Sequence, residues 1–380
     1  MALLYTEEQQ ELIALVRDMA ENEIKPHVKA ADEAGECPRE LFDWGFNMGL
    51  HMVEIPEEYG GMGLSYETCA MMFEELAKVD AAYADTFVTN FVAFRNIHLY
   101  GTPEQAQHFV DRTADGGFAA FCLSEANAGS DVAAMRTTAV REGDEYVING
   151  TKSFITNGSI SSVYVVFAKT DPAAGGKGIT GFLIDAGTPG LSAGVHENKM
   201  GFRLSDTCEV VFDNVRVPAS ARIGEEGQGM RIALDALNLS RAFICTLGVG
   251  IMQRALDEAV GYARQRKQFG QRLIDLQMVQ AMLADMAIKT EASRVLVNSC
   301  MKQMDRGEMV RKEGAIVKTF VTDAMQEVVS NAVQVLGGYG YSKDYPVEKL
   351  MRDAKIFQIF EGTNQIQRTT IAKILDKEYR

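Results

Sequence analysis

The sequence has little positive charge and no long apolar run. Its 380 residues include 38 Lys and Arg against 52 Asp and Glu, which gives a formal net charge of −14. This acidic balance argues against a surface for nucleic acid or for anionic membranes. A bilayer span needs roughly 18 apolar residues, and the sequence shows neither such a run nor a secretory or transit pattern at its start. We therefore expect a cytoplasmic protein that binds no nucleic acid and does not insert into a membrane.

Cysteine and histidine are also sparse, with 6 and 5 residues respectively. The cysteines stand tens of residues apart without a C-x-x-C pair, which argues against a disulfide framework or a zinc site. The histidines are scattered singly, with no acidic partner and no metal-ligand spacing. We therefore expect reduced, buried thiols and no metal centre.

The usual glycine-rich nucleotide loops are missing. No G-K-[ST] follows the turn-rich stretch from Pro56 to Gly63, so we interpret it as an ordinary turn rather than a phosphate loop. No strand leads into a G-x-G-x-x-G pattern, which argues against a Rossmann unit. The pair Gly248 and Gly250 lies inside a helical pattern, where it predicts a close crossing of two helices.

The apolar patterning divides the chain into three parts. Helical periodicity fills the first part, short β-rich runs separated by turn residues fill the second, and long helical stripes fill the third. The chain has no internal repeats and no long linkers. The sequence thus predicts an α+β protein with an N-terminal helical domain (1–118), a central β domain (119–225) and a C-terminal helical bundle (226–380).

Three local signals are sharp enough to be checked one by one. Thr6 and Gln9 predict a capping box at the start of the first helix. The pair Asn149-Gly150 predicts a two-residue hairpin turn. Gly337 is expected to end a long helix in a left-handed conformation.

Three segments are more polar, or richer in glycine, than their apolar surroundings. Their small residues let a ligand approach the backbone, and their hydroxyls can donate hydrogen bonds to phosphate or to ring heteroatoms. Taken singly, each also fits an ordinary role, a hairpin turn for the first two and a helix cap for the third. The segments are 121–131 (FCLSEANAGSD), 149–158 (NGTKSFITNG) and 359–368 (IFEGTNQIQR).

Together these segments resemble the acyl-CoA dehydrogenase family, and the resemblance covers essentially the whole chain. Several other motifs stand in the family's order and strengthen the match. The resemblance implies an N-terminal helical domain, a central β-barrel domain and a C-terminal four-helix bundle, with FAD between barrel and bundle, usually in a homotetramer. The additional motifs are Tyr59-Gly60-Gly61, Lys199-Met200-Gly201 with Arg203 and Ser205, Val215-Arg216-Val217-Pro218, Arg266-Lys267-Gln268-Phe269-Gly270, Gln334 to Gly338 and Glu361-Gly362-Thr363.

The resemblance implies FAD-dependent oxidation of an acyl-CoA thioester, with electrons passing on to an electron-transfer flavoprotein. A base must remove the weakly acidic Cα proton while the Cβ hydrogen leaves as hydride to flavin N5. Glu361 matches the family's base, and its apolar neighbours should raise its pKa toward the working pH. Some members carry the base immediately before the arginine matched here by Arg241. This chain has Ser240 there, which leaves Glu361 as the only candidate at either position.

The resemblance also assigns the binding residues. The backbone N–H of Glu361 and a ribityl hydroxyl of the flavin would polarise the thioester carbonyl. Ser130, Arg241 and Gly362 would face the CoA ester, and the Arg241 guanidinium suits its phosphate or base. Phe154 stands where the family frequently has Trp, which changes the stacking area. The flavin residues, some reaching across a subunit interface, are expected to be Phe121, Leu123, Ser124, Ser130, Phe154, Thr156, Arg266, Phe269, Gln277, Gln334, Gly338, Thr363 and Gln365.

Asp85 departs from the family pattern. It aligns with the helix that closes the acyl pocket, although an alignment shifted by one turn would leave it on the surface. A carboxylate against an alkyl chain would be costly. Inside the pocket, Asp85 could pair with a polar or cationic acyl group, or act as the base in the 1,4-dehydrogenation of a cyclic enoyl thioester such as cyclohex-1-ene-1-carboxyl-CoA. A subclass of the family forms cyclic dienes in this way.

Two other function classes stay open. Acyl-CoA oxidases and flavin monooxygenases share the fold, but they tend to be longer or to lack the equivalent of Glu361, and this chain does neither. A flavin-free helical scaffold is the second alternative. The combined presence of Glu361 and the hydroxyls of Ser124 and Thr156 argues against it.

Overall fold

The computed structural model describes residues 5–380, and helices come first along the chain. These helices are α1 (Glu7–Met19), α2 (Lys25–Ala34), α3 (Arg39–Asn47), α4 (Tyr66–Val79), α5 (Ala81–Tyr100) and α6 (Pro103–Thr113). The Thr6 hydroxyl accepts from the backbone N–H of Gln9, and the Gln9 side chain accepts from the backbone N–H of Thr6. The predicted capping box is therefore confirmed. Helix α5 is buried from Ala81 to Ile97, since it packs against both the sheet and a long helix of the C-terminal part.

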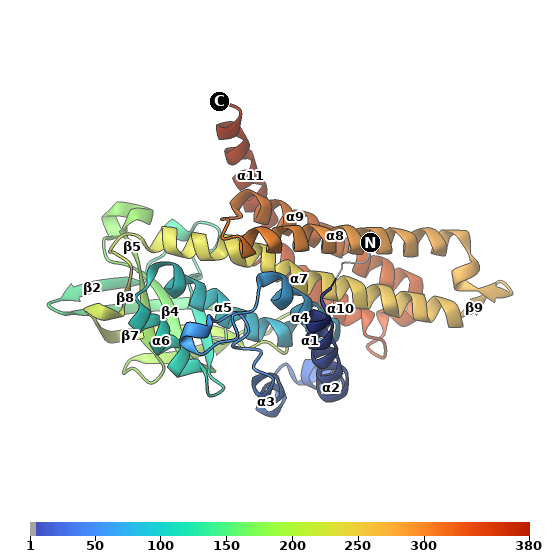
Figure 1. Cartoon of the computed structure of the whole chain (residues 1–380), viewed down its shortest axis with the longest axis horizontal. Coiled ribbons are helices and arrows are strands. Elements are labelled where there is room, and N and C mark those ends of the chain that lie inside the picture. The colour runs from blue at the N-terminus through green and yellow to red at the C-terminus, as the bar shows by residue number, and fades with distance from the viewer. Residues whose placement is uncertain (1–4) are drawn as a thin grey trace.

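A mixed eight-stranded sheet forms the β domain and one end of the molecule (Figure 1). Its strands are β1 (Phe118–Cys122), β2 (Thr138–Glu142), β3 (Glu145–Thr156), β4 (Ser161–Lys169), β5 (Ile179–Asp185), β6 (Leu191–His196), β7 (Thr207–Pro218) and β8 (Arg222–Ile223). In space they run in the order β6-β7-β3-β2-β4-β5-β8, and β1 pairs with β4 in parallel. The strands enclose an apolar core of their own, as a β domain requires.

The hairpin turn predicted at Asn149-Gly150 is wrong. Strand β3 continues through both residues, and its pairing with β7 shifts register there. A Cβ on Gly150 would lie 2.4 Å from Oγ1 of Thr137, so the glycine serves a close approach of two chain segments rather than a turn. The tight turn between β2 and β3 lies instead at Gly143-Asp144.

Long helices form the C-terminal part. They are α7 (Gly229–Gln265), α8 (Gln277–Asp305), α9 (Arg311–Leu336), α10 (Val347–Ala354) and α11 (Asn364–Glu378), with the short strands β9 (Lys267–Gln268) and β10 (Gln271–Arg272) between α7 and α8. Helices α7, α8 and α9 pack on one another, and α10 and α11 pack on α9. Gly337 ends α9 with the expected positive φ of 62°, but its ψ of −134° lies outside the left-handed helical region.

Helix α7 runs through the core. The expectation that no segment has the length and hydropathy of a membrane span is wrong for α7, which contains an 18-residue window of mean hydropathy 1.4. Inside the fold 89% of that window is buried, as is typical of a core helix. The predicted close crossing is confirmed at Gly250, because a Cβ there would lie 2.7 Å from Cβ of Ala77 on α4.

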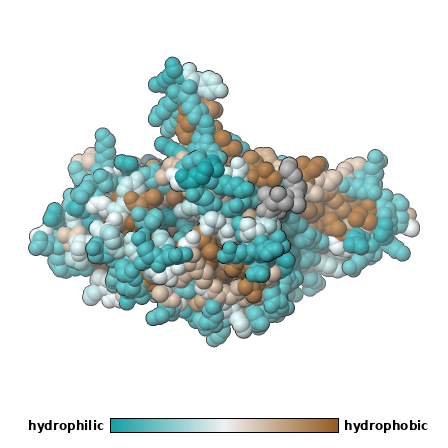
Figure 2. Space-filling model, viewed as in Figure 1, coloured by the Kyte–Doolittle hydropathy of each residue, from teal (hydrophilic) through white to brown (hydrophobic). Residues whose placement is uncertain are grey.

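The sheet and the β9–β10 hairpin lie at opposite ends of the molecule, and α11 projects from its middle (Figure 1). Figure 2 shows a largely hydrophilic face with apolar residues gathered over the bundle toward the β9 end. Phe269 in this hairpin and Met278 in the first turn of α8 are 91% and 76% exposed. All six cysteines are free, and five of them are buried as predicted, whereas Cys37 is only half-buried.

Candidate active site

Glu361 lies in the turn between α10 and α11 with a left-handed backbone, φ 58°. Its Oε1 accepts a hydrogen bond from Oγ of Ser240 on α7 at 2.8 Å. Its Oε2 is out of solvent contact and has no hydrogen-bond partner among residues 5–380. Burial raises the pKa of this carboxyl, against the lowering effects of the Ser240 hydrogen bond and of three cationic side chains. Oε2 is therefore an unpaired carboxylate oxygen of increased proton affinity, which is what a general base needs.

The turn around Glu361 is held by α7, α9 and α11. Nε of Arg241 donates to the carbonyl oxygen of Glu361 at 2.8 Å, and Nε2 of Gln367 donates to the same oxygen at 3.2 Å. Nζ of Lys318 donates to the carbonyl oxygen of Gly362 at 3.0 Å. These contacts sustain a backbone conformation that a non-glycine residue rarely adopts. Sequence reasoning missed Lys318 and Gln367, because polar residues in a helical pattern ordinarily face solvent.

Arg241 was predicted to face CoA. In the structure its guanidinium binds the backbone of the Glu361 turn. The side chain is buried, with Nη1 donating to Oδ1 of Asn238 at 2.7 Å in addition to the bond from Nε to Glu361. Burial lowers the pKa of the guanidinium, and the charge of Glu361 opposes this effect. A contact of Arg241 with CoA stays a prediction.

Asp85 is buried on α5, so its alternative placement on the surface is wrong. Its carboxylate has no hydrogen-bond partner in the part of the chain that the structure describes. The pKa of Asp85 rises to about 7, first because burial disfavours its charge and second because Glu361 carries a like charge nearby. Two carboxyl groups far apart in the sequence thus share one buried environment.

Lys199 is the cation that acts on Asp85. It precedes β7, and its Nζ donates to the carbonyl oxygen of Ser205 and, at 2.7 Å, to Oγ1 of Thr207. Burial lowers the pKa of Lys199 to about 8, while the charge of Asp85 opposes that shift. The sequence singled out Lys199 only as part of a family motif and gave no reason to place it near Asp85.

The two polar segments of the β domain lie side by side. The backbone N–H of Ser153 donates to the carbonyl oxygen of Ser124 at 3.0 Å. Nζ of Lys152 donates to Oε1 of Glu125 at 2.9 Å, and both side chains are buried. This buried ion pair, which sequence reasoning missed, joins segment 121–131 to segment 149–158. The two segments therefore form one surface.

That surface presents an aromatic ring and several free hydroxyls. Phe154 has a φ of 58° and is 64% exposed, so an uncommon backbone conformation turns its ring outward. The hydroxyls of Ser124, Ser130 and Thr156 have no hydrogen-bond partner within residues 5–380. Free donors beside an exposed ring fit the heteroatoms and the phosphates of FAD. Of the other residues predicted here, Phe121 is partly buried and Leu123 is buried.

Five predicted flavin residues lie at the other end of the molecule. They are exposed and surround the β9–β10 hairpin, the start of α8 and the end of α9, away from the sheet that carries Phe154 (Figure 1). One chain therefore does not bring all the predicted flavin residues together. Thr363 and Gln365, by contrast, lie two and four residues after Glu361, and Thr363 caps α11 by accepting from the N–H of Ile366 at 3.3 Å. The five distant residues are Arg266, Phe269, Gln277, Gln334 and Gly338.

Domain models of one protein family match along the chain in order. The N-terminal domain of acyl-CoA dehydrogenase matches residues 6–117, the middle domain 120–215 and the C-terminal domain 227–375. The chain belongs to the acyl-CoA dehydrogenase family. The predicted family, fold, enzyme class and cofactor are thereby confirmed, and this acyl-CoA dehydrogenase is an oxidoreductase that uses FAD.

Individual relatives of this acyl-CoA dehydrogenase are similar over nearly the whole chain. The cyclohex-1-ene-1-carbonyl-CoA dehydrogenase of Syntrophus aciditrophicus is 41% identical over 97% of this chain and 90% of its own. The solved butyryl-CoA dehydrogenase of Megasphaera elsdenii has a TM-score of 0.95 and 39% identity, covering 99% of this chain and 100% of its own. A chain from the structure of the electron transferring flavoprotein of Acidaminococcus fermentans has a TM-score of 0.95 and 40% identity, with 99% of each chain covered.

Proposed function

We propose that Glu361 removes the Cα proton of an acyl-CoA thioester. Bound FAD would accept the Cβ hydrogen with its electron pair at N5, so that the loss of a proton and a hydride leaves a carbon–carbon double bond. The observation that supports Glu361 is its Oε2, a buried carboxylate oxygen without a partner in residues 5–380 and with a raised pKa. Its backbone N–H also makes no hydrogen bond within these residues, which leaves it free to donate to the thioester carbonyl.

The test is anaerobic addition of straight, branched and cyclic acyl-CoA esters to the yellow protein. At least one ester should bleach the flavin absorbance, and the relative rates rank the acyl groups. A flavin that stays oxidised with every ester would contradict the proposal. A colourless protein that FAD does not reconstitute would contradict it as well and would favour the scaffold alternative.

We infer that two copies of the chain share each flavin, within a homotetramer. The support is the position of Arg266, Phe269, Gln277, Gln334 and Gly338, which lie far from Phe154 of the same chain and are exposed (Figure 1). Light scattering should therefore give the mass of a tetramer. Arg266→Ala should lower the bound FAD per chain while the middle-domain site is intact. A flavin-loaded monomer would contradict shared binding.

An electron-transfer flavoprotein is the proposed electron acceptor, which the similarity to a chain from a flavoprotein structure supports. The alternative is an acyl-CoA oxidase or flavin monooxygenase that uses oxygen. Oxygen uptake by the substrate-reduced protein separates the two. Slow uptake, with fast reoxidation by the flavoprotein, agrees with a dehydrogenase, and fast uptake contradicts it.

A second candidate reaction is the 1,4-dehydrogenation of a cyclic enoyl-CoA with Asp85 as the base. In cyclohex-1-ene-1-carboxyl-CoA, the ring double bond acidifies the γ-proton, so a base and a hydride acceptor across the ring give a cyclic diene. The observation that favours this reaction is the buried carboxyl of Asp85, which has no hydrogen-bond partner within residues 5–380 and whose pKa of about 7 suits proton transfer near neutrality. One similar protein carries the name of this activity.

Asp85→Asn distinguishes the two reactions. If Asp85 is the γ-base, the variant should lose about a hundredfold or more of its rate with cyclohexenoyl-CoA, the usual range for a general base. With butyryl-CoA the same variant should keep its rate within a few-fold. Equal loss on both esters, or no loss on either, removes the special role of Asp85.

A further inference from the structure

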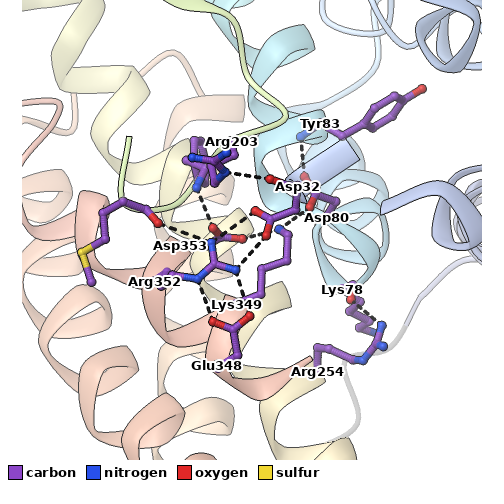
Figure 3. A network of polar contacts seen from close by, with 12 residues as sticks. Asp32, Lys78, Asp80, Tyr83, Arg203, Arg254, Glu348, Lys349, Arg352 and Asp353 are labelled. Carbon is purple, nitrogen blue, oxygen red and sulfur yellow. Dashed lines mark hydrogen bonds and ion pairs between the residues drawn. The ribbon is translucent and has the colours of Figure 1, made fainter. Parts of the chain in front are cut away.

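A buried charge cluster joins the helices that lead to Asp85 and Glu361. Nζ of Lys349 on α10 donates to Oδ2 of Asp80 and to Oδ2 of Asp353. Figure 3 shows Lys349 between the two carboxylates. Burial alone would lower the pKa of Lys349, but the two carboxylates raise it above the usual value. The three side chains, Lys349, Asp80 and Asp353, are all buried and are called the Lys349 cluster below.

The Lys349 cluster fixes the start of α5. Asp80 is the N-cap of this helix, and its Oδ1 accepts from the backbone N–H of Tyr83 at 2.8 Å. The same carboxylate binds Lys349 through its other oxygen. Asp85 follows in the second turn of the helix, so the ion pair at Asp80 determines where Asp85 enters the site.

On its other side, the Lys349 cluster reaches the Glu361 turn. Oδ1 of Asp353 accepts from the backbone N–H of Phe202 at 2.6 Å, and Phe202 has a left-handed φ of 59°. The Phe202 ring packs edge-on against Phe360, the residue before Glu361, with centroids 6.1 Å apart. Phe202 therefore links Asp353 to the segment that carries Glu361, so the position of Asp353 affects the position of Glu361.

We propose that the Lys349 cluster is a positioning device that sets the separation of the two carboxyl groups, Asp85 and Glu361. One ammonium group binds a carboxylate on each helix, so it fixes the placement of α5 relative to α10. The inference rests on the proposed role of Glu361. Misplacement of a reacting group by about 1 Å can lower a rate about a hundredfold, so a positioning device of this kind affects catalysis.

The test breaks the ion pairs while keeping the shapes. Asp80→Asn retains an N-cap oxygen for Tyr83, and Asp353→Asn retains an acceptor for Phe202. Each should lower the rate of flavin reduction at saturating butyryl-CoA about tenfold to a hundredfold, while KM stays within about threefold. Glu348→Gln is the matched control, because Glu348 lies on the same helix and, within residues 5–380, pairs with Arg352 alone. Its rate should stay within about twofold of wild type.

A double variant separates positioning from loss of stability. Glu361→Asp already displaces the base, so adding Asp80→Asn to it should cost much less than Asp80→Asn costs alone. The inference is overturned if the double variant loses the full product of the two single-variant rate reductions. It is also overturned if Asp80→Asn lowers the melting temperature but leaves the rate at saturating substrate unchanged. If Asp353→Asn fails to fold, Asp80→Asn decides the matter. A wild-type protein that no ester reduces would refute the proposed function instead, so the two failures are distinguishable.

Discussion

Oγ of Ser240 lies 2.8 Å from Oε1 of Glu361. By the family resemblance, Ser240 stands at the second position expected to carry a base, so the two candidate base positions are in contact in this chain. A carboxylate at either position would therefore reach the same site. Here the serine donates to one oxygen of Glu361, and the other oxygen has no hydrogen-bond partner within residues 5–380, so under the proposed function it is the oxygen that accepts the proton.

Ser240→Ala should shift the pH dependence of flavin reduction. The Ser240 hydrogen bond lowers the pKa of Glu361, so its loss raises that pKa and leaves less of the base ionised at a given pH. The acid limb of the rate profile should move to higher pH, with activity recovered in alkaline buffer. Ser240→Thr, which keeps the hydroxyl, should leave the limb in place. An unmoved limb in Ser240→Ala would show that the bond does not act on the base.

Asp85→Asn should stabilise the protein at alkaline pH. The folded-state pKa of Asp85 is about 7, above the unfolded value, so the folded state holds a proton that the unfolded state releases between about pH 4 and 7. Wild type therefore loses stability relative to the variant as pH rises through this window. Urea unfolding at pH 8 should show a gain of about 1–4 kcal/mol for the variant. The gain should disappear below about pH 3, where Asp85 is largely protonated in both states.

The exposed Asp376 offers a control for that measurement. Asp376→Asn should change the free energy of unfolding by less than about 0.5 kcal/mol at either pH. A loss of stability in Asp85→Asn at pH 8 would mean that the carboxylate has a favourable partner.

Lys318→Met should destabilise the protein by about 1–3 kcal/mol, because the carbonyl of Gly362 and the Oδ1 of Asn364 lose a buried donor. The pKa of Lys318 is lowered to about 8, mainly by burial. Between about pH 8 and 10 the folded wild type releases a proton that the unfolded chain still holds, so its stability rises with pH. The deficit of the variant should therefore be larger at pH 9.5 than at pH 7.5. A deficit independent of pH would contradict this.

Two glycines of α7 give a matched packing experiment. A Cβ at Gly250 would lie 2.7 Å from the carbonyl oxygen of Glu74, whereas a Cβ at Gly261 would meet nothing within 4 Å. Gly250→Ala should destabilise the protein by about 1–3 kcal/mol by forcing α4 and α7 apart. Gly261→Ala should stabilise it by roughly 0.5–1 kcal/mol, the difference in helix propensity. Thermal unfolding of both variants checks this, and equal effects would contradict it.

Local signals predicted local structure well. The Thr6 and Gln9 capping box needs only residues three apart, and it forms as predicted. The hairpin prediction at Asn149-Gly150 failed because the glycine is needed where the backbone passes close to Thr137. That contact is with a residue outside the local pattern, so the pattern does not reveal it. Ile316 and Phe320 lie on a helical stripe of α9, yet they are exposed in the single chain. The apolar periodicity therefore predicted the helix correctly, but it did not distinguish the apolar residues that are buried within the chain from those that are exposed.

In the candidate active site, too, the sequence predicted the residue in the motif but not the residues that contact it. The family motif predicted Glu361, and the structure adds what surrounds it: Lys318 from α9, Gln367 from α11 and the ion cluster at Lys349. The contacts of Lys318 with Gly362 and of Lys349 with Asp80 join residues far apart in the chain, so no spacing in the sequence reveals them. Gln367 lies only six residues after Glu361, but the local pattern gave no reason to expect its hydrogen bond to that carbonyl oxygen. The sequence left open whether Asp85 lies on the surface or in the interior. The packing of α5 in the structure shows that it is buried.

The role of Glu361 is measured most directly by anaerobic flavin reduction with the best acyl-CoA ester in wild type and in Glu361→Gln. The glutamine keeps the shape of the side chain and loses the basic oxygen. FAD content should stay the same, while the reduction rate should fall by about a hundredfold to ten-thousandfold. A Glu361→Gln variant that bleaches its flavin at the wild-type rate would show that another group removes the proton and would contradict the proposed role of Glu361.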